Sequence, residues 1–280
     1  MYEQLIYRNH LGETIAFGQN GIFVNENELH DYAWDYSSEN GKVSNFVRNV
    51  TKKSVPVVIA CADPDEGVAT INNLMEYAEK DILANKPGKM IVGEYYYTCY
   101  ITGSRKKKYS GKRGFIHAEL EVVTDSPVWV KEIASSFLKK GTGEAANGGE
   151  GKNLDYPFDF PYDFASITAN ASIVNTSFAS SDFEMHIFGP VQEPVIYIND
   201  HLYELTGNIE AGEIVTINSK SKTIIKTDAK GAQSNFFRHR GKESYIFEKI
   251  APGENTVNWN SNIFGFDITL FEERSEPKWT

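Results

Sequence analysis

Short runs in which apolar and polar residues alternate cover much of this 280-residue chain. A period of two residues is typical of strands with one buried face. The first half contains EQLIYRN and TIAFG around a turn at HLGE, and two weakly alternating runs around SSENG within residues 28–50. It continues with the apolar SVPVVIACA and with two longer strands, KMIVGEYYYTCYITG and GFIHAELEVVTD. These runs predict a β-rich first half.

One segment of the first half follows a helical period instead. Asp63 is a suitable N-cap, Pro64 suits the first helical position, and Asp65 and Glu66 complement the helix dipole. The sequence NKPG at 85–88 ends the segment. Between these signals one apolar stripe recurs at helical spacing, formed by Val68, Ile71, Leu74, Met75, Ala78 and Ile82.

The second half begins after a change in composition. Residues 139–153, KKGTGEAANGGEGKN, are rich in glycine and small residues, as is typical of a linker or long loop. Nine short strand candidates follow: ASIVNTSF, FEMHIFG, PVIYIND, HLYELTGN, EIVTINSK, TIIKTD, SYIFEKI, NTVNWN and FDITLFEE. They predict a β-sandwich or jelly roll. The sequence therefore predicts two domains, residues 1–138 and 154–280, joined by 139–153.

The segment GPVQEPVIYIN, residues 189–199, shows the clearest strand pattern of the second half. Val195, Tyr197 and Asn199 should share one face, opposite Ile196 and Ile198. The following AGEIVTINSKSKTI predicts a second strand, a turn and a third strand. We expect all three strands in one sheet.

Charge and cysteine content narrow the classes of function. A formal charge of −10 argues against tight binding of nucleic acid, which needs cations along the phosphates. It is compatible with an acidic surface that repels the phosphates of DNA passing by. Cys61 and Cys99 both lie in apolar runs, which predicts two buried thiols on strands in a reducing cytoplasm. The start lacks a signal-peptide pattern, and no apolar run reaches the ~18 residues that span a bilayer. We therefore expect neither export by a signal peptide nor a membrane span.

Motifs for catalysis are absent from the sequence. The six histidines show no metal-ligand spacing, and neither a nucleophile elbow nor a phosphate-binding loop occurs. Glu119 and Glu121 share one strand face but alternate with apolar residues, as is typical of the solvent-exposed face of a half-buried strand. We predict no enzyme, no cofactor and no metal site.

Two groups of residues are candidates for contacts with partners. The connection SRKKKYSGKRG is either a solvated hairpin tip, a contact with an acidic neighbour such as another copy, or a nucleic-acid contact; its cations are Arg105, Lys106, Lys107, Lys108, Lys112 and Arg113. Aromatic residues of the second half are either glycan or partner contacts or parts of the core: Tyr197, Tyr203, Tyr245 and Trp259. The aromatic segment YPFDFPYDF at 156–164 is an interface anchor, a sugar platform or packing between domains.

The order of these motifs resembles the distal tail protein family (Dit) of long-tailed, siphovirus-type bacteriophages and prophages. The succession comprises YRNHLGETIAF, KPGKMIVG, VVTDSPVWV, YPFDFPYDF, GPVQEPVIYIN, AGEIVTINSKSKTI and APGENTVNW. Ser126, between Asp125 and Pro127, departs from the family's acidic-proline-aromatic step.

This resemblance implies a mainly β fold, with a tail-tube-like N-terminal domain holding one helix and a galectin-like β-sandwich after it. It implies a virion structural protein of the tail tip or baseplate, assembled in the bacterial cytoplasm. Six copies would form a ring that joins the tail tube to the tail-associated lysin or fibre and to receptor-binding proteins. DNA would pass through the ring without specific binding. The family has no catalytic residues to transfer to this chain.

Two other functions stay open at this stage. The sandwich and its aromatic residues are also typical of a carbohydrate-binding module for host cell-wall glycans. A hydrolase built on a sandwich is the third alternative. A protein that assembles into a tail should form rings, whereas a carbohydrate-binding module should bind glycans and a hydrolase should degrade cell walls.

Overall fold

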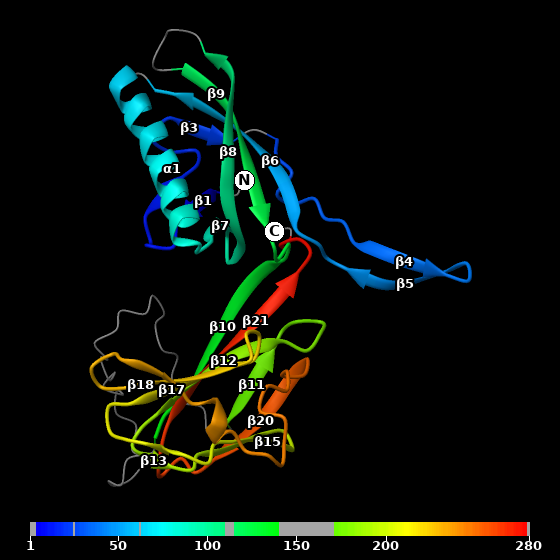
Figure 1. The fold of residues 1–280 in the computed structure, drawn as a ribbon, viewed down its shortest axis with the longest axis vertical. Coiled ribbons are helices and arrows are strands. Elements are labelled where there is room, and N and C mark those ends of the chain that lie inside the picture. Colours follow the sequence, from blue (N-terminus) through cyan, green and yellow to red (C-terminus); the bar gives the residue numbers. More distant parts are fainter. Residues whose placement is uncertain (1–3, 25, 62, 110–114, 140–170, 279–280) are drawn as a thin grey trace, which may run out of the picture. The chain divides into compact units, whose positions relative to one another are not determined.

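The computed structural model describes residues 4–24, 26–61, 63–109, 115–139 and 171–278, and its fold is mainly β with a single helix longer than one turn among them (Figure 1). The chain divides into two compact units. Unit 1 comprises Met1–Lys131 and Glu273–Thr280, and unit 2 comprises Glu132–Glu272. The segment 139–153, except Lys139, and the aromatic segment 156–164 lie outside the described residues. The predicted mainly β fold class is confirmed.

Strand β8 (Tyr95–Tyr109) organises unit 1 because its two halves pair with different neighbours. Its first half pairs with β7 (Gly88–Val92), and its second half pairs with β9 (Phe115–Thr124). The antiparallel order continues from β7 through β1 (Leu5–Arg8) to β2 (Thr14–Ala16), and from β9 through β6 (Thr51–Ala60) to β3 (Ile22–Val24).

Two predictions about this region are wrong. KMIVGEYYYTCYITG forms the two strands β7 and β8, because Gly93 adopts a positive φ of 55° and turns the chain. The basic connection is shorter than predicted, because β8 continues through Arg105–Tyr109 by pairing with β9.

Helix α1 (Pro64–Ala84) begins and ends as predicted. The Asp63 side chain accepts a hydrogen bond from the Asp65 amide, and Asn85 ends the helix in the left-handed conformation. Leu74 and Ala78 are buried in the core of unit 1, but the stripe is wrong at its end. Ile82 is exposed, whereas the neighbouring Asp81 is fully buried.

The strands β4 (Asp35–Glu39) and β5 (Lys42–Val47) form the predicted hairpin around SSENG. Asn40 and Gly41 make the turn, both with positive φ, as a type I′ hairpin turn requires. The two strands form a separate two-stranded sheet. Figure 1 shows this hairpin projecting away from the other strands of unit 1.

Unit 2 is a β-sandwich. One sheet is the part β19-β18-β17-β12-β21-β10 of a longer sheet, and the other has the order β11-β20-β14-β15. Side chains from both sheets form one core, including Phe183, Met185, Ile196 and Val257. The strands of the first sheet are β10 (Trp129–Phe137), β12 (Asp182–Phe188), β17 (Ile214–Asn218), β18 (Thr223–Thr227), β19 (Gln233–Asn235) and β21 (Phe266–Arg274). Those of the second are β11 (Ser172–Asn175), β14 (Val195–Ile198), β15 (His201–Glu204) and β20 (Gly253–Trp259). A short pair, β13 (Val191–Gln192) with β16 (Asn208–Ile209), and the one-turn η1 (Phe237–His239) complete the unit.

Two predictions for unit 2 need correction. SYIFEKI is not a strand: Ile246, Phe247 and Ile250 are buried, but only Ile250 forms a bridge, with Ser181. GPVQEPVIYIN and AGEIVTINSKSKTI do not share a sheet, because β14 pairs with β15 and β20 while β17 pairs with β12 and β18. The predicted alternation in β14 is confirmed, with Ile196 and Ile198 buried and Tyr197 exposed.

The only α-helix in the described part of the chain is not apolar enough to cross a membrane.

Candidate interaction surfaces

The predicted basic cluster lies on and after the second half of β8. Arg105 and Lys106 are exposed, and the Lys106 ammonium donates a hydrogen bond to the Ser104 hydroxyl at 2.7 Å. Lys107 and Lys108 belong to β8 by their backbone, whereas Lys112 and Arg113 lie outside the described residues. The use of this cluster as a contact between copies stays a prediction.

A groove of about 690 Å³ lies on unit 1 beside Arg105. Its lining includes three cations and three carboxylates, from Lys52, Lys53, Arg105, Glu28, Glu119 and Glu121. Lys52 forms an ion pair with Glu121, and the Lys53 ammonium donates to the backbone carbonyl of Glu28 at 2.8 Å. Charges that balance in this way do not form the positive surface that phosphate groups require.

The four aromatic candidates of the second half fall into two pairs. Tyr203 is buried and donates its hydroxyl proton to the Glu248 carbonyl at 2.8 Å. Trp259 packs edge-on against Phe266 and donates its indole proton to the Phe264 carbonyl at 3.0 Å. Their rings therefore serve the core, as the alternative interpretation held.

Tyr197 and Tyr245 form the other pair and are exposed. The Lys222 ammonium lies 5.3 Å from the centre of the Tyr245 ring. Only these two of the four aromatic candidates remain available to a ligand or partner.

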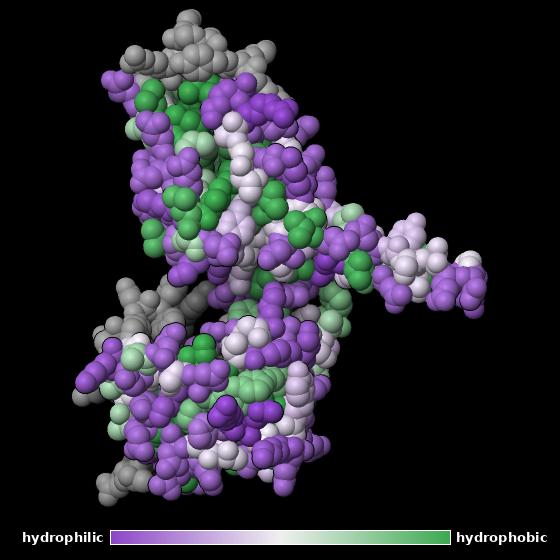
Figure 2. Space-filling model, viewed as in Figure 1, coloured by the Kyte–Doolittle hydropathy of each residue, from purple (hydrophilic) through white to green (hydrophobic). Residues whose placement is uncertain are grey.

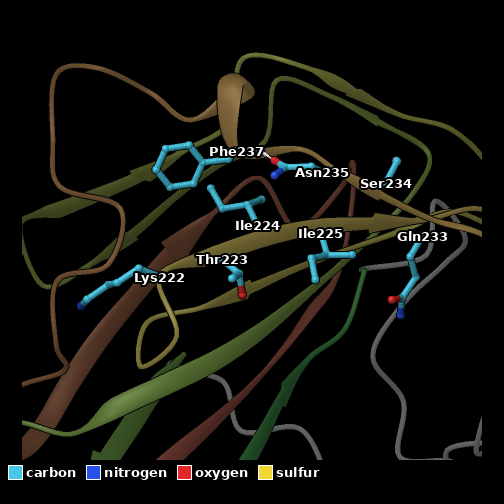
Figure 3. Close-up of a pocket in the computed structure, with 8 residues that line it drawn as sticks. All are labelled: Lys222, Thr223, Ile224, Ile225, Gln233, Ser234, Asn235 and Phe237. Carbon is cyan, nitrogen blue, oxygen red and sulfur yellow. Dashed lines mark hydrogen bonds between the residues drawn. The ribbon is translucent and has the colours of Figure 1, made fainter.

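A shallow pocket of about 280 Å³ lies at the β18–β19 edge of unit 2 (Figure 3). Apolar and polar side chains line it together, namely Lys222, Thr223, Ile224, Ile225, Gln233, Ser234, Asn235 and Phe237. The side chain of Asn235 accepts a hydrogen bond from the Phe237 amide at 2.9 Å, which fixes the turn into η1. The pocket offers a half-buried ring, amides and hydroxyls, but within the described residues no grouping of His, Cys, Asp and Glu suits a metal ion.

The buried carboxylate of Asp81 in unit 1 is occupied in structural contacts. Asp81, fully buried, accepts a hydrogen bond from the Tyr7 hydroxyl at 2.6 Å and another from the His10 amide at 2.8 Å. The His10 Nδ1 atom lies 2.6 Å from Asp81 Oδ1, the same oxygen that accepts from the His10 amide, whereas the Tyr7 hydroxyl donates to Oδ2. Burial, and secondly the hydrogen bond to Asp81, raises the pKa of Tyr7 far above its ordinary value.

The two cysteines do not provide a reactive centre. Cys99 is buried on β8 as predicted, and burial raises the pKa of its thiol to about 12. Cys61 is only partly buried and lies just after β6, so the prediction of two buried thiols on strands is wrong for this residue. Burial, followed by the charges of Glu66 and Asp63, raises the pKa of Cys61 as well. A thiol with a raised pKa carries little of the thiolate that nucleophilic chemistry needs.

The hairpin β4–β5 is an exposed surface that the sequence analysis did not connect with a contact. Tyr36 and Phe46 of the hairpin and Trp34 just before it are exposed. Figure 2 shows the hairpin projecting from the rest of unit 1. Trp34 and Tyr36 alternate before the turn, with Phe46 after it, and this pattern was the available signal.

Comparison with known proteins shows which class of proteins shares this fold. No protein-family model matches the chain, and no curated protein matches its sequence. Solved structures of phage tail hub and baseplate proteins match it over nearly its whole length, so the chain has the fold of this class.

The solved structures that match this chain include proteins of two phages. The first is the SPP1 Dit (gp 19.1) protein, described as a paradigm of the hub adsorption apparatus in phages that infect Gram-positive bacteria. It has a TM-score of 0.59 and 10% identity, and the match covers 98% of this chain and 100% of that chain. Chains of the activated phage P2 baseplate, with Ca and with Sr, each have a TM-score of 0.60, 13% identity and 99% and 100% coverage. The resemblance to distal tail proteins noted in the sequence is thus confirmed at the level of the fold.

Proposed function

We propose that this protein is a structural hub of a phage or prophage tail tip. The observation that carries the proposal is the match to the SPP1 Dit protein along all of that chain. Because both units take part in the match, it does not depend on a single widespread sandwich fold.

In the proposed assembly, six copies form a ring at the end of the tail tube. One side of the ring contacts the tail tube protein, and the other contacts the tail-associated lysin or fibre and the receptor-binding proteins. DNA passes through without specific binding. The ring is assembled in the bacterial cytoplasm and functions in the virion tail, with Arg105 and the neighbouring lysines as contacts between copies.

Imaging and binding test this proposal together. The purified full-length chain should form rings in negative-stain micrographs, or bind the products of the adjacent tail genes in a pull-down assay. Light scattering should give the number of copies in the ring. A chain that forms no ring and binds none of these proteins would refute the hub function.

A second candidate function is glycan binding by unit 2. The exposed Tyr245 and the pocket beside Phe237 present rings next to amide and hydroxyl groups, which is the chemistry that recognises sugars. Tyr245→Ala should abolish binding on an array of cell-wall glycans without unfolding the protein. Trp259→Ala is unsuitable for this purpose, because Trp259 packs against Phe137 and Phe266 in the core. Equal binding by the wild-type chain and Tyr245→Ala would exclude Tyr245 from such a site.

A further inference from the structure

One segment of unit 2, residues 220–249, carries a charge opposite to that of the whole chain. It contains eight lysines and arginines against three aspartates and glutamates, a net charge of +5 within a chain of formal charge −10. Lys226 and Lys249 each form an ion pair with a carboxylate at 2.8 Å. Lys222 and Lys242 are exposed, and neither forms an ion pair with a carboxylate of the described part of the chain. The segment therefore presents positive charge that is available to an anionic partner.

Two of these cations lie over aromatic rings of a connected cluster. The Arg240 guanidinium is 4.3 Å from the centre of the Phe237 ring. The Lys222 ammonium is 5.3 Å from the ring centre of Tyr245 and 5.6 Å from that of Phe247. The rings of Phe237 and Phe247 stack with centres 6.0 Å apart, and Tyr245 meets Phe247 edge-on at 5.8 Å. We call these five residues the cation–ring cluster.

The cluster offers a ring, positive charge and a pocket to solvent. Tyr245 is 53% exposed and Lys222 is exposed, whereas Phe247 is buried. Lys222 and Phe237 also line the pocket of about 280 Å³, and Figure 3 shows both at the end of the pocket away from Gln233. The other side chains of the pocket add amide and hydroxyl groups next to the charge.

Contacts with the backbone hold the cluster in place. Lys222 ends the β17–β18 turn with a left-handed φ of 57°. The Tyr245 carbonyl lies 2.9 Å from the His201 Nε2 atom on β15, and Arg240 donates a hydrogen bond to the Phe237 carbonyl at 3.1 Å. Groups that are ordered in advance lose less conformational entropy when a ligand binds.

We infer that the cation–ring cluster and its pocket bind an anionic polysaccharide, a chain of sugar rings that carries phosphate or carboxylate groups. A sugar ring stacks on the exposed face of Tyr245, and Lys222 and Arg240 attract the anionic groups. The acidic remainder of the chain repels a polyanion and so directs it to this segment. Single-stranded nucleic acid fits less well, because it needs successive exposed rings and Phe247 is buried. This inference rests on the second candidate function, glycan binding by unit 2, and specifies its ligand class.

Lys222→Asn tests the charge of the cluster without disturbing the turn. Asparagine adopts the left-handed conformation readily, so the backbone should keep its path. The matched control is Lys86→Asn, which makes the same change of charge at an exposed position of unit 1. Both variants should have the melting temperature of the wild type.

Biolayer interferometry of the full-length protein with three matched polymers measures the binding. The probes are phosphorylated dextran, carboxymethyl dextran and neutral dextran. The two charged polymers should bind at least about tenfold more tightly than the neutral one, and added salt should weaken their binding. Lys222→Asn and Tyr245→Ala should each weaken binding of the charged polymers by about 5-fold, whereas Lys86→Asn should bind as the wild type does. The tighter of the two charged polymers identifies the preferred anionic group.

Each contrary outcome overturns the inference in a distinguishable way. Binding of neutral glycans alone would exclude an anionic ligand but leave glycan binding by unit 2 intact. Equal affinities of Lys222→Asn and Lys86→Asn would show that the cluster is not the site. A thymidine oligonucleotide that binds as tightly as phosphorylated dextran would exclude a contribution from the sugar rings. Absence of binding to any glycan would refute the second candidate function itself, while ring formation and binding to the adjacent tail proteins report on the hub function alone.

Discussion

Replacing Asp81 should destabilise unit 1 through the groups that it leaves without a partner. Asp81 lies in the last turns of α1 and joins the helix to the N-terminal hairpin by accepting hydrogen bonds from the Tyr7 hydroxyl and the His10 amide. Asp81→Ala removes both acceptor oxygens from a fully buried position. Gly88 packs against the same carboxylate, because an added Cβ there would lie 2.3 Å from Asp81 Oδ2. The close approach of this backbone to Asp81 therefore requires a glycine.

The size of the effect follows from these contacts. A hydrogen bond to a charged group contributes about 1.5–3 kcal/mol, and a buried group without a partner costs about 1–3 kcal/mol. We therefore expect Asp81→Ala to lower the free energy of unfolding by about 3–5 kcal/mol, and Tyr7→Phe by about 1.5–3 kcal/mol. In the Asp81→Ala background, Tyr7→Phe should be nearly neutral, because the hydroxyl that it removes no longer has an acceptor.

Urea unfolding of the four proteins in this double-mutant cycle measures the coupling between the two residues. Hydrogen exchange should be faster in peptides from β1 and the end of α1, with peptides from unit 2 as an internal reference. A loss below about 1 kcal/mol for Asp81→Ala, or equal effects of Tyr7→Phe in both backgrounds, would refute the reasoning.

Three further predictions concern pH and backbone packing. Burial raises the pKa of Tyr7, Tyr97 and Tyr203 above the unfolded value of ~10. The stability that this shift contributes is fully present below that pH, and above it the free energy of unfolding falls by about 1.4 kcal/mol per group per pH unit. The absorbance of tyrosinate should therefore appear together with unfolding. Burial opposes ionisation of Asp182, but hydrogen bonds from Lys249 and Ser219 hold its pKa below the ordinary value. Lys249→Met should therefore lower stability at neutral pH, with a difference from wild type that disappears as the pH falls through the lowered pKa of Asp182; a constant difference would contradict this assignment. Gly189→Ala should destabilise by about 1–3 kcal/mol, because its Cβ would lie 2.0 Å from the Glu210 carbonyl oxygen; Gly103→Ala, with 3.4 Å to Glu121, is the control in the same urea assay.

Local signals accounted for most of the elements that the sequence predicted correctly. The cap at Asp63, the Asn85 terminus and the Asn40–Gly41 turn each depend on a few neighbouring residues. The alternation of β14 also follows from the period of a strand. Such features could be predicted because their energetics do not require knowledge of the rest of the chain.

Errors arose where distant residues decide the outcome. Ile82 and Asp81 exchange the expected roles because Tyr7 and His10, more than seventy positions away, supply partners for a buried carboxylate. The separation of β14 from β17 depends on which strands they meet, and alternation does not encode this choice. Tyr203 and Tyr197 look alike in the sequence, but neighbours bury the first and leave the second exposed.

The division of the chain has a consequence for modularity. Unit 1 takes residues from both ends of the chain, and the Arg48 side chain donates a hydrogen bond to the Ser275 hydroxyl at 2.9 Å. Unit 2 is therefore an insertion within unit 1, bounded by Glu132 and Glu272. Truncation from the C-terminus damages unit 1 before it reaches unit 2. By contrast, unit 2 is one continuous segment, so a replacement between Glu132 and Glu272 would leave every residue of unit 1 in place.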